Sequence, residues 1–330
     1  MILVTGATGL VGSHLLVKLL QNEVTVKAIY RKKESLEAVK NVFGHYNQSL
    51  LFNKIEWIKA DINDIPSLEK AFVNISKVYH CAAFISFDPN DAELLMKVNT
   101  EGTANIVNCC LDFNVEKLCY VSSVAALGDP LDTQNIINEE TEYNPEKLHS
   151  EYSISKYAAE MEVWRGFQEG LKVVIVNPGV IFGYGFPNNG SSAFIKAIKK
   201  GNPFYTKGKF GIIAVEDVVN CMVELMKNDV NGERFTLVSE NPTYDKILNL
   251  VAETLKVKKP FIYASKSFLS FAWRFDWFLS LVLRKKRILT KATSKALHST
   301  REFDNTKIKE TINYRFLDMD DYLKKLLKSF

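Results

Sequence analysis

The stretch "ILVTGATGLVGSHLLVKLL", residues 2–20, decides the fold class of this chain. It begins with the apolar and β-branched residues of a buried strand and continues as a helical pattern. Gly6, Gly9 and Gly12 lie between the two in a GxxGxxG spacing. A glycine-rich turn from a strand into a helix lets the backbone approach a pyrophosphate, which then lies at the positive helix end. The stretch predicts dinucleotide binding, although a tight turn that needs only small residues would use the same glycines.

Short strand-like runs recur along the first half of the chain and alternate with helical patterns. They occupy residues 24–30, 55–59, 77–82, 117–123 and 172–177. Strands that are buried on both faces and separated by helices indicate an α/β protein with a doubly wound parallel sheet, the Rossmann fold. The long helical patterns at 91–113 and 151–169 are expected to cover one sheet face, and they are candidate surfaces for a homodimer.

The regular alternation ends near Asn177, where a loop rich in Gly, Pro and Asn precedes helices and short strands. We expect a dinucleotide-binding Rossmann domain made of residues 1–178 and 212–240. A smaller, partly interleaved C-terminal lobe would comprise residues 179–211 and 241–330. Because loop-rich regions on a rigid scaffold commonly carry binding sites, this lobe is predicted to bind the substrate.

The bulk composition narrows the classes of function. Lys and Arg number 42 against 38 Asp and Glu, and a net charge of +4 is too weak to indicate nucleic-acid binding. The five cysteines lack the spacing of a metal site, so we expect no metal and free buried thiols in a reducing cytoplasm. The start "MILVTG" leaves no room for a signal peptide, which also favours a cytoplasmic location.

Residues 267–287, "SFLSFAWRFDWFLSLVLRKKR", are the other strongly apolar stretch. Arg274 and Asp276 at its centre would be costly in hydrocarbon, so we do not expect it to span a membrane. Its aromatic side chains and the basic run 284–287 would suit contact with a membrane surface. A buried helix or a pocket lid is the favoured interpretation, because amphipathic core helices are commoner.

The second strand ends in Tyr30, Arg31 and Lys32. In Rossmann folds an acidic residue at this point binds the adenosine ribose, whereas a nearby arginine accommodates a 2′-phosphate. Here a tyrosine stands where the carboxylate is expected, and two cations follow it. The sequence therefore favours NADP(H) as the cofactor. NAD(H) stays open, because the two cations could instead belong to a solvated strand end.

Residues 151–160, "EYSISKYAAE", place Tyr152 and Lys156 four apart, on one face of a helix. A phenol with a pKa near 10 is a poor base at neutral pH, and an adjacent ammonium favours its ionised form. The pair therefore predicts an acid/base, although exposed pairs of this kind commonly have no function.

Three motifs occur together: "TGATGLVG" at 5–12, "VSSVAALG" at 121–128 and "YSISK" at 152–156. With "HCAA" at 80–83, "VNTEGTAN" at 98–105 and "NPGVIFG" at 177–183, they resemble the extended short-chain dehydrogenase/reductases over nearly the whole chain. The "SSVAALG" version and the Arg-bearing second strand are more similar to dihydroflavonol reductase and 3β-hydroxysteroid dehydrogenase relatives than to nucleotide-sugar epimerases.

The resemblance implies a catalytic set of Ser123, Tyr152 and Lys156. Tyr152 would protonate a carbonyl oxygen or act as the base in reverse. Lys156 would also bind the nicotinamide ribose, and Ser123, or else its neighbour Ser122, would bind the substrate oxygen. Asn99 would tie strand ends together. The implied cofactor contacts, among which Asp61 and Ile62 would hold the adenine, are Gly6, Thr8, Gly9, Leu10, Val11, Gly12, Arg31, Lys32, Asp61, Ile62, Ala82, Ala83, Tyr152, Lys156, Pro178 and Val180.

The leading interpretation is an NADP(H)-dependent oxidoreductase that acts on the carbonyl or alcohol of a small, fairly apolar molecule. Phe84, Ser86 and Phe186 are its candidate substrate contacts. The alternative is a nucleotide-sugar epimerase or dehydratase with bound NAD(P). Such relatives carry an arginine that helps hold the diphosphate, whereas this chain has Phe210 there, with Lys207 or Lys209 nearby. A non-catalytic cofactor-sensing protein is an alternative of another class, against which the intact catalytic set argues.

Overall fold

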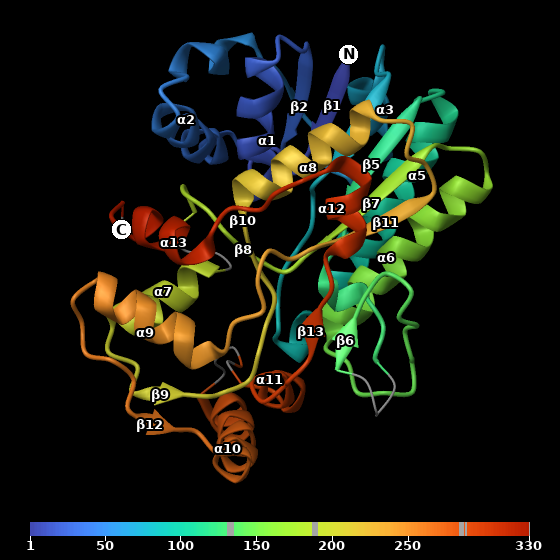
Figure 1. The fold of residues 1–330 in the computed structure, drawn as a ribbon. Helices are drawn as coiled ribbons and strands as arrows, with labels where there is room; N and C mark the ends of the chain where they lie inside the picture. The colour runs from blue at the N-terminus through green and yellow to red at the C-terminus, as the bar shows by residue number, and fades with distance from the viewer. Residues whose placement is uncertain (131–134, 187–190, 284–286, 288, 330) are drawn as a thin grey trace.

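The computed structural model describes residues 1–130, 135–186, 191–283, 287 and 289–329, and a seven-stranded sheet forms its centre (Figure 1). The strand order is β11-β7-β5-β4-β1-β2-β3, and every neighbouring pair is parallel. The strands are β1 (Ile2–Thr5), β2 (Val26–Tyr30), β3 (Glu56–Lys59), β4 (Lys77–His80), β5 (Lys117–Val121), β7 (Val173–Pro178) and β11 (Glu233–Leu237).

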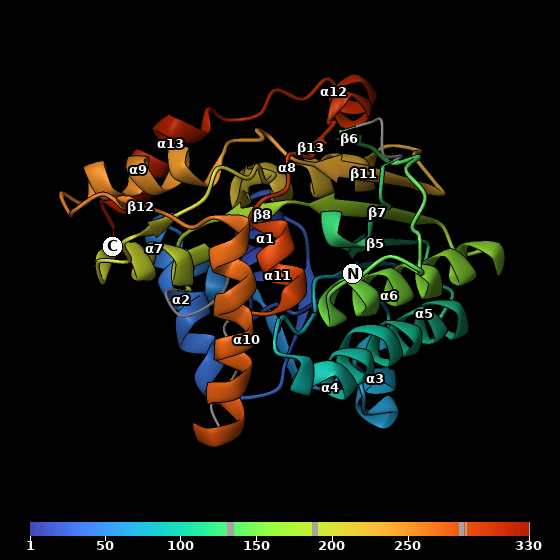
Figure 2. The same cartoon turned by 90° about the horizontal axis from the view of Figure 1, so that it is seen from below.

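Helices cover both faces of the sheet because its central strands are apolar on both sides. All six residues of β7 are buried. On one face pack α1 (Leu10–Gln21), α2 (Leu36–His45) and α8 (Val215–Lys227). On the other lie α3 (Ile65–Phe72), α4 (Ala92–Leu95), α5 (Gly102–Asp112) and α6 (Glu151–Gln168) (Figure 2). The predicted doubly wound α/β architecture is confirmed.

The strand order reverses between β1 and β4, the two neighbours in the middle of the sheet. In open parallel sheets, ligands bind outside the carboxyl ends of the strands at such a switch point. Gly6 follows β1 and Cys81 follows β4, so the glycine turn lies at this position.

A smaller lobe follows β7 and has a core of its own. Its core is formed by β8 (Val180–Phe182), α7 (Ser191–Lys199), β10 (Ile212–Ala214), α9 (Tyr244–Thr254) and α13 (Met319–Leu327). Short strand pairs join β9 (Phe204–Tyr205) to β12 (Ile262–Tyr263), and β6 (Ile136–Ile137) to β13 (Glu302–Phe303). The remaining helices are α10 (Lys266–Leu283), α11 (Lys291–Ala296) and α12 (Thr306–Ile312).

The lobe is interleaved with the sheet in sequence, because β11 returns to the sheet after β10 and before α9. The boundaries at 178, 211 and 240 stay a prediction. All five cysteines are free thiols, four of them buried. Among the described residues, no helix combines the length and the apolar content needed to cross a membrane.

Candidate active site

The turn between β1 and α1 needs its glycines for steric reasons. Gly6 adopts φ +63°, and a Cβ there would lie 2.5 Å from the backbone nitrogen of Ala82. A Cβ on Gly12 would lie 2.3 Å from the carbonyl oxygen of Gly6. Gly9 is the N-cap of α1 and supplies no side-chain cap, and the first turn of that helix contains no acidic residue. The positive end of α1 is therefore open to an anion.

This cradle fits the pyrophosphate of a dinucleotide, because the backbone can be approached closely where side chains are missing. Thr8, Leu10 and Val11 are half-buried around the turn, as is Ala82 beside it, whereas Ala83 is exposed. Of the two further predicted contacts, Pro178 is buried in β7, and Val180 is exposed at the start of β8.

The predicted 2′-phosphate and adenine contacts meet at the carboxyl edge of β2 and β3. Arg31 Nη1 lies 4.0 Å from Asp61 Oδ2, and the two side chains are 67% and 41% exposed. Lys32 is exposed beside them. Ile62, in contrast, is buried in the core, where a Cβ on Gly102 would collide with its side chain. The structure thus brings the two charged groups together and buries the Ile62 side chain, and the predicted adenine contact of Ile62 stays a prediction.

Ser123 and Tyr152 lie next to each other, close enough for the Ser123 side chain to affect the pKa of the Tyr152 hydroxyl. Two short-range contacts fix them: the Ser123 hydroxyl accepts from the Ala125 amide at 3.1 Å, and the Ser153 hydroxyl donates to the Ala125 carbonyl at 2.6 Å. Burial raises the pKa of Tyr152, and its hydrogen bond with Ser123 opposes that shift. Phe87 contacts the Tyr152 ring at a centroid distance of 5.7 Å.

Lys156 is 1% exposed, and its ammonium points toward the end of β5. Its Nζ donates to the Tyr120 hydroxyl at 2.6 Å and to the Val121 carbonyl at 2.9 Å. Burial lowers the pKa of Lys156 to about 7, while Glu160, four residues along α6, opposes the shift. The Lys156 side chain therefore exchanges between its ammonium and neutral amine forms near neutral pH.

Glu160 is fully buried behind Lys156 and holds several elements together. Its Oε2 accepts from the Ser122 hydroxyl at 2.6 Å and from Asn177 Nδ2 at 2.8 Å. Its Oε1 lies 3.0 Å from Arg234 Nη1, a guanidinium that also donates to the Glu139 carbonyl. Because Ser122 is committed to this network, its placement favours Ser123 as the serine that faces Tyr152.

We expect Glu160→Ala to lower the free energy of unfolding by about 3 kcal/mol, because it leaves the largely buried guanidinium of Arg234 without its carboxylate. Urea denaturation measures the effect. Glu162→Ala is the matched control: it removes a half-exposed pair with Arg165 on the same helix and should cost less than about 1 kcal/mol. Equal losses in the two variants would contradict the buried-pair assignment.

Asn99 lies in a π-helical turn, η4 (Met96–Glu101), that interrupts the helix between α4 and α5. Its side-chain amide donates to the Phe84 carbonyl at 3.0 Å and to the Ser155 hydroxyl at 2.9 Å, and accepts from the Phe84 amide at 2.7 Å. Asn99 thereby ties the segment after β4 to α6, next to Lys156.

A cavity of about 810 Å³ opens beside Tyr152, between the carboxyl edge of the sheet and the smaller lobe. Ser153 and Val124 line it next to Tyr152 and Ser123, and Val180 and Phe210 line it from the lobe. Phe210 stacks on Tyr244 at 4.2 Å. The wall of this cavity is apolar near the candidate catalytic pair, which makes it the candidate substrate cavity.

The same cavity carries a strong positive charge. Among the residues that the structure describes, the cavity is lined by one acid, Asp129, and by six cations: Lys209, Lys266, Arg274, Lys291, Lys295 and Arg301. Arg301 pairs with Asp129 at 2.8 Å, and Lys209 pairs with Glu302. Within the described part of the chain, no carboxylate lies in ion-pair range of the other four. An anionic group on the substrate would be attracted here.

The three predicted substrate residues do not line this cavity. Phe186 is 9% exposed and packs into the core with α2. Phe84 packs against the core on the opposite sheet face, and the Ser86 hydroxyl donates to Asp91 Oδ2 at 2.6 Å. Their assignment as substrate contacts stays a prediction that this cavity does not support. Phe87, the next aromatic residue along, lines the cavity instead.

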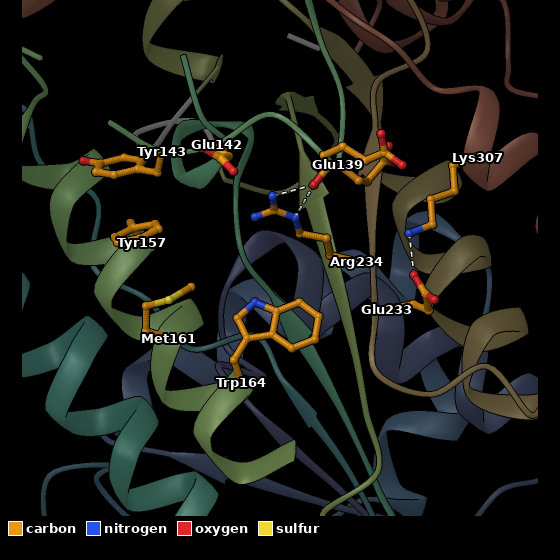
Figure 3. Close-up of a pocket in the computed structure, with 10 residues that line it drawn as sticks. Glu139, Glu142, Tyr143, Tyr157, Met161, Trp164, Glu233, Arg234 and Lys307 are labelled. Atoms are coloured by element: carbon orange, nitrogen blue, oxygen red, sulfur yellow. Dashed lines mark hydrogen bonds and ion pairs between the residues drawn. The ribbon is translucent and has the colours of Figure 1, made fainter. Parts of the chain in front are cut away.

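A second, open groove lies on the outer side of α6, away from Tyr152 (Figure 3). Tyr157, Met161 and Trp164 project into it from α6, and Arg234, which bonds Glu160, also lines it. We assign the substrate to the larger cavity, because only that cavity is lined by direct neighbours of Ser123 and Tyr152.

Sequence reasoning missed Glu160, Arg234 and Tyr120. The four-residue spacing between Lys156 and Glu160 was a usable signal, because it places both on one helix face. Arg234 and Tyr120 lie on separate strands and become neighbours only through the strand order. No local pattern marks them.

Comparisons with known proteins agree with this geometry. The sequence profile described as "NAD dependent epimerase/dehydratase family" matches residues 2–238. A putative dihydroflavonol 4-reductase of Synechocystis sp. is 31% identical over 74% of this chain and 69% of its own length. A UDP-glucose 4-epimerase of Vibrio cholerae is 28% identical over 72% of this chain and 70% of its own length. The crystal structure of gox2253 is 26% identical, with a TM-score of 0.83 over 99% of this chain and 97% of that one.

Proposed function

The chain belongs to the NAD-dependent epimerase/dehydratase family, and on that premise we propose that it is an NADP(H)-dependent oxidoreductase. Membership makes it an enzyme, an NAD(P)-dependent oxidoreductase or epimerase. Its substrate would be the carbonyl or alcohol of a small molecule that is apolar at the reacting end. The observation that carries the proposal is the adjacent Ser123–Tyr152 pair, whose direct neighbours line an apolar cavity wall.

In the reductive direction the Tyr152 hydroxyl gives its proton to the carbonyl oxygen, which the Ser123 hydroxyl holds by a hydrogen bond. A nicotinamide cofactor, held at the glycine turn Gly6–Gly12, would supply the hydride that completes the alcohol. The charged ammonium of Lys156 favours the phenolate left on Tyr152, which takes a proton back from solvent. In the oxidative direction the same phenolate accepts the alcohol proton.

Arg31 and Lys32 support the choice of NADP(H), because exposed cations at the end of β2 can pair with a 2′-phosphate. Asp61 beside Arg31 leaves NAD(H) as the alternative, since a carboxylate can bind the ribose diol.

We expect Arg31→Ser to raise the dissociation constant of NADPH about tenfold or more, and that of NADH little, because one charge-assisted phosphate contact is lost. Fluorescence titration of both cofactors measures this. Lys40→Ser is the control, since it removes a half-exposed cation on α2. Equal binding of both cofactors by the unmodified protein would contradict the NADP(H) proposal.

A nucleotide-sugar epimerase is the second candidate, and the cationic cavity favours it, because four cations without acidic partners could hold a diphosphate. Phe210, stacked on Tyr244, stands where epimerase relatives carry an arginine and favours the reductase.

The two candidates are separated by incubating the protein with NADPH and a panel of aromatic and aliphatic carbonyl compounds, with and without an acidic group, and separately with UDP- and GDP-sugars. Stoichiometric NADPH consumption supports the oxidoreductase. Sugar interconversion without net cofactor consumption would reject it.

A homodimer through residues 91–113 and α6 is also part of the proposal. Exposed apolar side chains on this surface support it: Leu94, Met96, Ile154 and Met161 are 37–45% exposed. Sedimentation velocity measures the assembly state.

A further inference from the structure

The outward face of α10 is apolar along its whole length. Five side chains recur there at helical spacing and are 43–69% exposed: Phe268, Phe271, Phe275, Phe278 and Val282. A helix on the surface of a soluble protein normally presents polar residues to water, and contiguous exposed apolar side chains mark an interaction site. We call these five residues the aromatic face of α10.

The apolar surface continues from α10 onto the neighbouring strands. Phe204 of β9 stacks on Phe268 with ring centroids 5.3 Å apart. Phe261, Ile262 and Tyr263, in and just before β12, are 39–59% exposed. The exposed patch is thus built from α10 and from the paired strands β9 and β12 beside it.

The inward face of α10 has a different role. Lys266, Ser270, Trp273 and Arg274 line the substrate cavity, and Leu269 is buried. The expectation of a buried helix or a pocket lid therefore describes only this inner face. Figure 1 shows α10 at the lower edge of the molecule beside α11, and residues of both helices line the cavity.

Charge is concentrated in the same part of the chain. Between Glu253 and Glu302 the sequence contains twelve Lys or Arg and a single acid, Asp276. This segment has a net charge of +11, so the rest of a chain with a total of +4 carries −7. Lys258 lies 4.3 Å from the Phe261 ring, which places a cation at the edge of the apolar patch. Of the basic run 284–287, residues 284–286 lie outside the described residues.

We propose that the aromatic face of α10, together with β12, docks on the surface of an anionic lipid bilayer. Exposed aromatic and aliphatic side chains insert at the boundary of headgroups and acyl chains, while Lys258 at the patch edge and the net positive charge of the segment attract anionic headgroups. A nucleic acid would use the cations but has no partner for five exposed apolar side chains. The proposal does not depend on the proposed function.

Docking in this orientation would bring the substrate cavity next to the bilayer, because α10 contributes to both. A substrate with an apolar body and an anionic group, which concentrates at such a surface, would have a short path to Tyr152.

The test is sedimentation of the full chain with vesicles of phosphatidylcholine alone or mixed with phosphatidylglycerol. We expect binding to the mixed vesicles, much weaker binding to the neutral ones, and a fall in binding as salt is raised. The triple variant Phe271→Ser, Phe275→Ser and Phe278→Ser should bind the mixed vesicles about tenfold less or weaker still. Its unfolding midpoint should not change, because all three rings are exposed.

The matched control replaces three exposed apolar residues of the Rossmann domain, Leu50, Ile65 and Val73, with serine. It should bind vesicles as the unmodified protein does. Undiminished binding by the phenylalanine variant, or equal binding to neutral vesicles, would overturn the proposal. The proposal would also be overturned if the protein did not bind vesicles and instead bound duplex DNA. The same holds if it did not bind vesicles and instead self-associated in light scattering, with the phenylalanine variant abolishing that self-association.

Discussion

Tyr152→Phe is expected to lower kcat by about 10²–10⁴-fold, the range that a positioned general acid contributes. The substitution removes the hydroxyl that protonates the substrate oxygen and keeps the ring that contacts Phe87. The glycine cradle at Gly6 to Gly12 is untouched, so the dissociation constant of NADPH should stay close to its original value. Steady-state kinetics with an active carbonyl compound and a fluorescence titration of NADPH measure the two quantities.

Tyr157→Phe serves as the control, because Tyr157 lies on the outer side of the same helix and lines the other groove. It should retain turnover. If Tyr152→Phe lost NADPH affinity in proportion to its loss of turnover, the assignment of Tyr152 as the acid would fail, since the damage would then be to cofactor binding.

The fold could be predicted from the sequence because its signals are local. Each strand of the sheet is a short apolar run that ends at a turn, and the predicted runs overlap β1 to β5 and β7. The glycine spacing locates the first crossover, because Gly6 and Gly12 have no room for a Cβ. The π-helical turn at Asn99 could not be predicted, because residues 91–113 form a continuous helical pattern with no signal that marks the turn.

The candidate site was only partly predictable, because several of its residues come from distant parts of the sequence and carry no local signal. Glu160 and Arg234 are 74 residues apart and meet because β11 joins the sheet beside β7. The cavity cations come from separate segments between Lys209 and Arg301. Phe186 shows the same limit, since an aromatic residue in a loop has the same letter whether it lines a cavity or, as here, fills the core.

The α10 segment shows what hydrophobic periodicity leaves undetermined. The sequence gives the apolar residues a helical spacing, but the same spacing suits a face covered by the protein's own core and a face exposed at the surface. Which one occurs depends on whether other elements pack over it. Here α11 and the cavity occupy the inner side.

Lys156→Met is expected to lower kcat by about 10²-fold or more and also to weaken NADPH binding, because the same ammonium would serve the Tyr152 phenolate and the nicotinamide ribose. It should change the pH dependence of stability as well. Burial lowers the pKa of native Lys156 to about 7, whereas the unfolded value is about 10.4. Between these values the unfolded chain binds a proton that the native protein does not, so this lysine makes stability rise with pH, by up to about 1.4 kcal/mol per unit.

The measurement is urea denaturation of the unmodified protein and of Lys156→Met, without cofactor. The series runs from pH 6, below both pKa values of the lysine, to about pH 9.5, which lies between them. Taking the difference between them removes the contributions of the buried tyrosines and cysteines, whose raised pKa values act with the opposite sign above their unfolded pKa. The free energy of unfolding of the unmodified protein, minus that of Lys156→Met, should be flat below pH 7 and rise above it. A difference that stays flat throughout would mean that native Lys156 remains fully charged, held by Glu160. Undiminished NADPH affinity in the variant would reject the ribose contact.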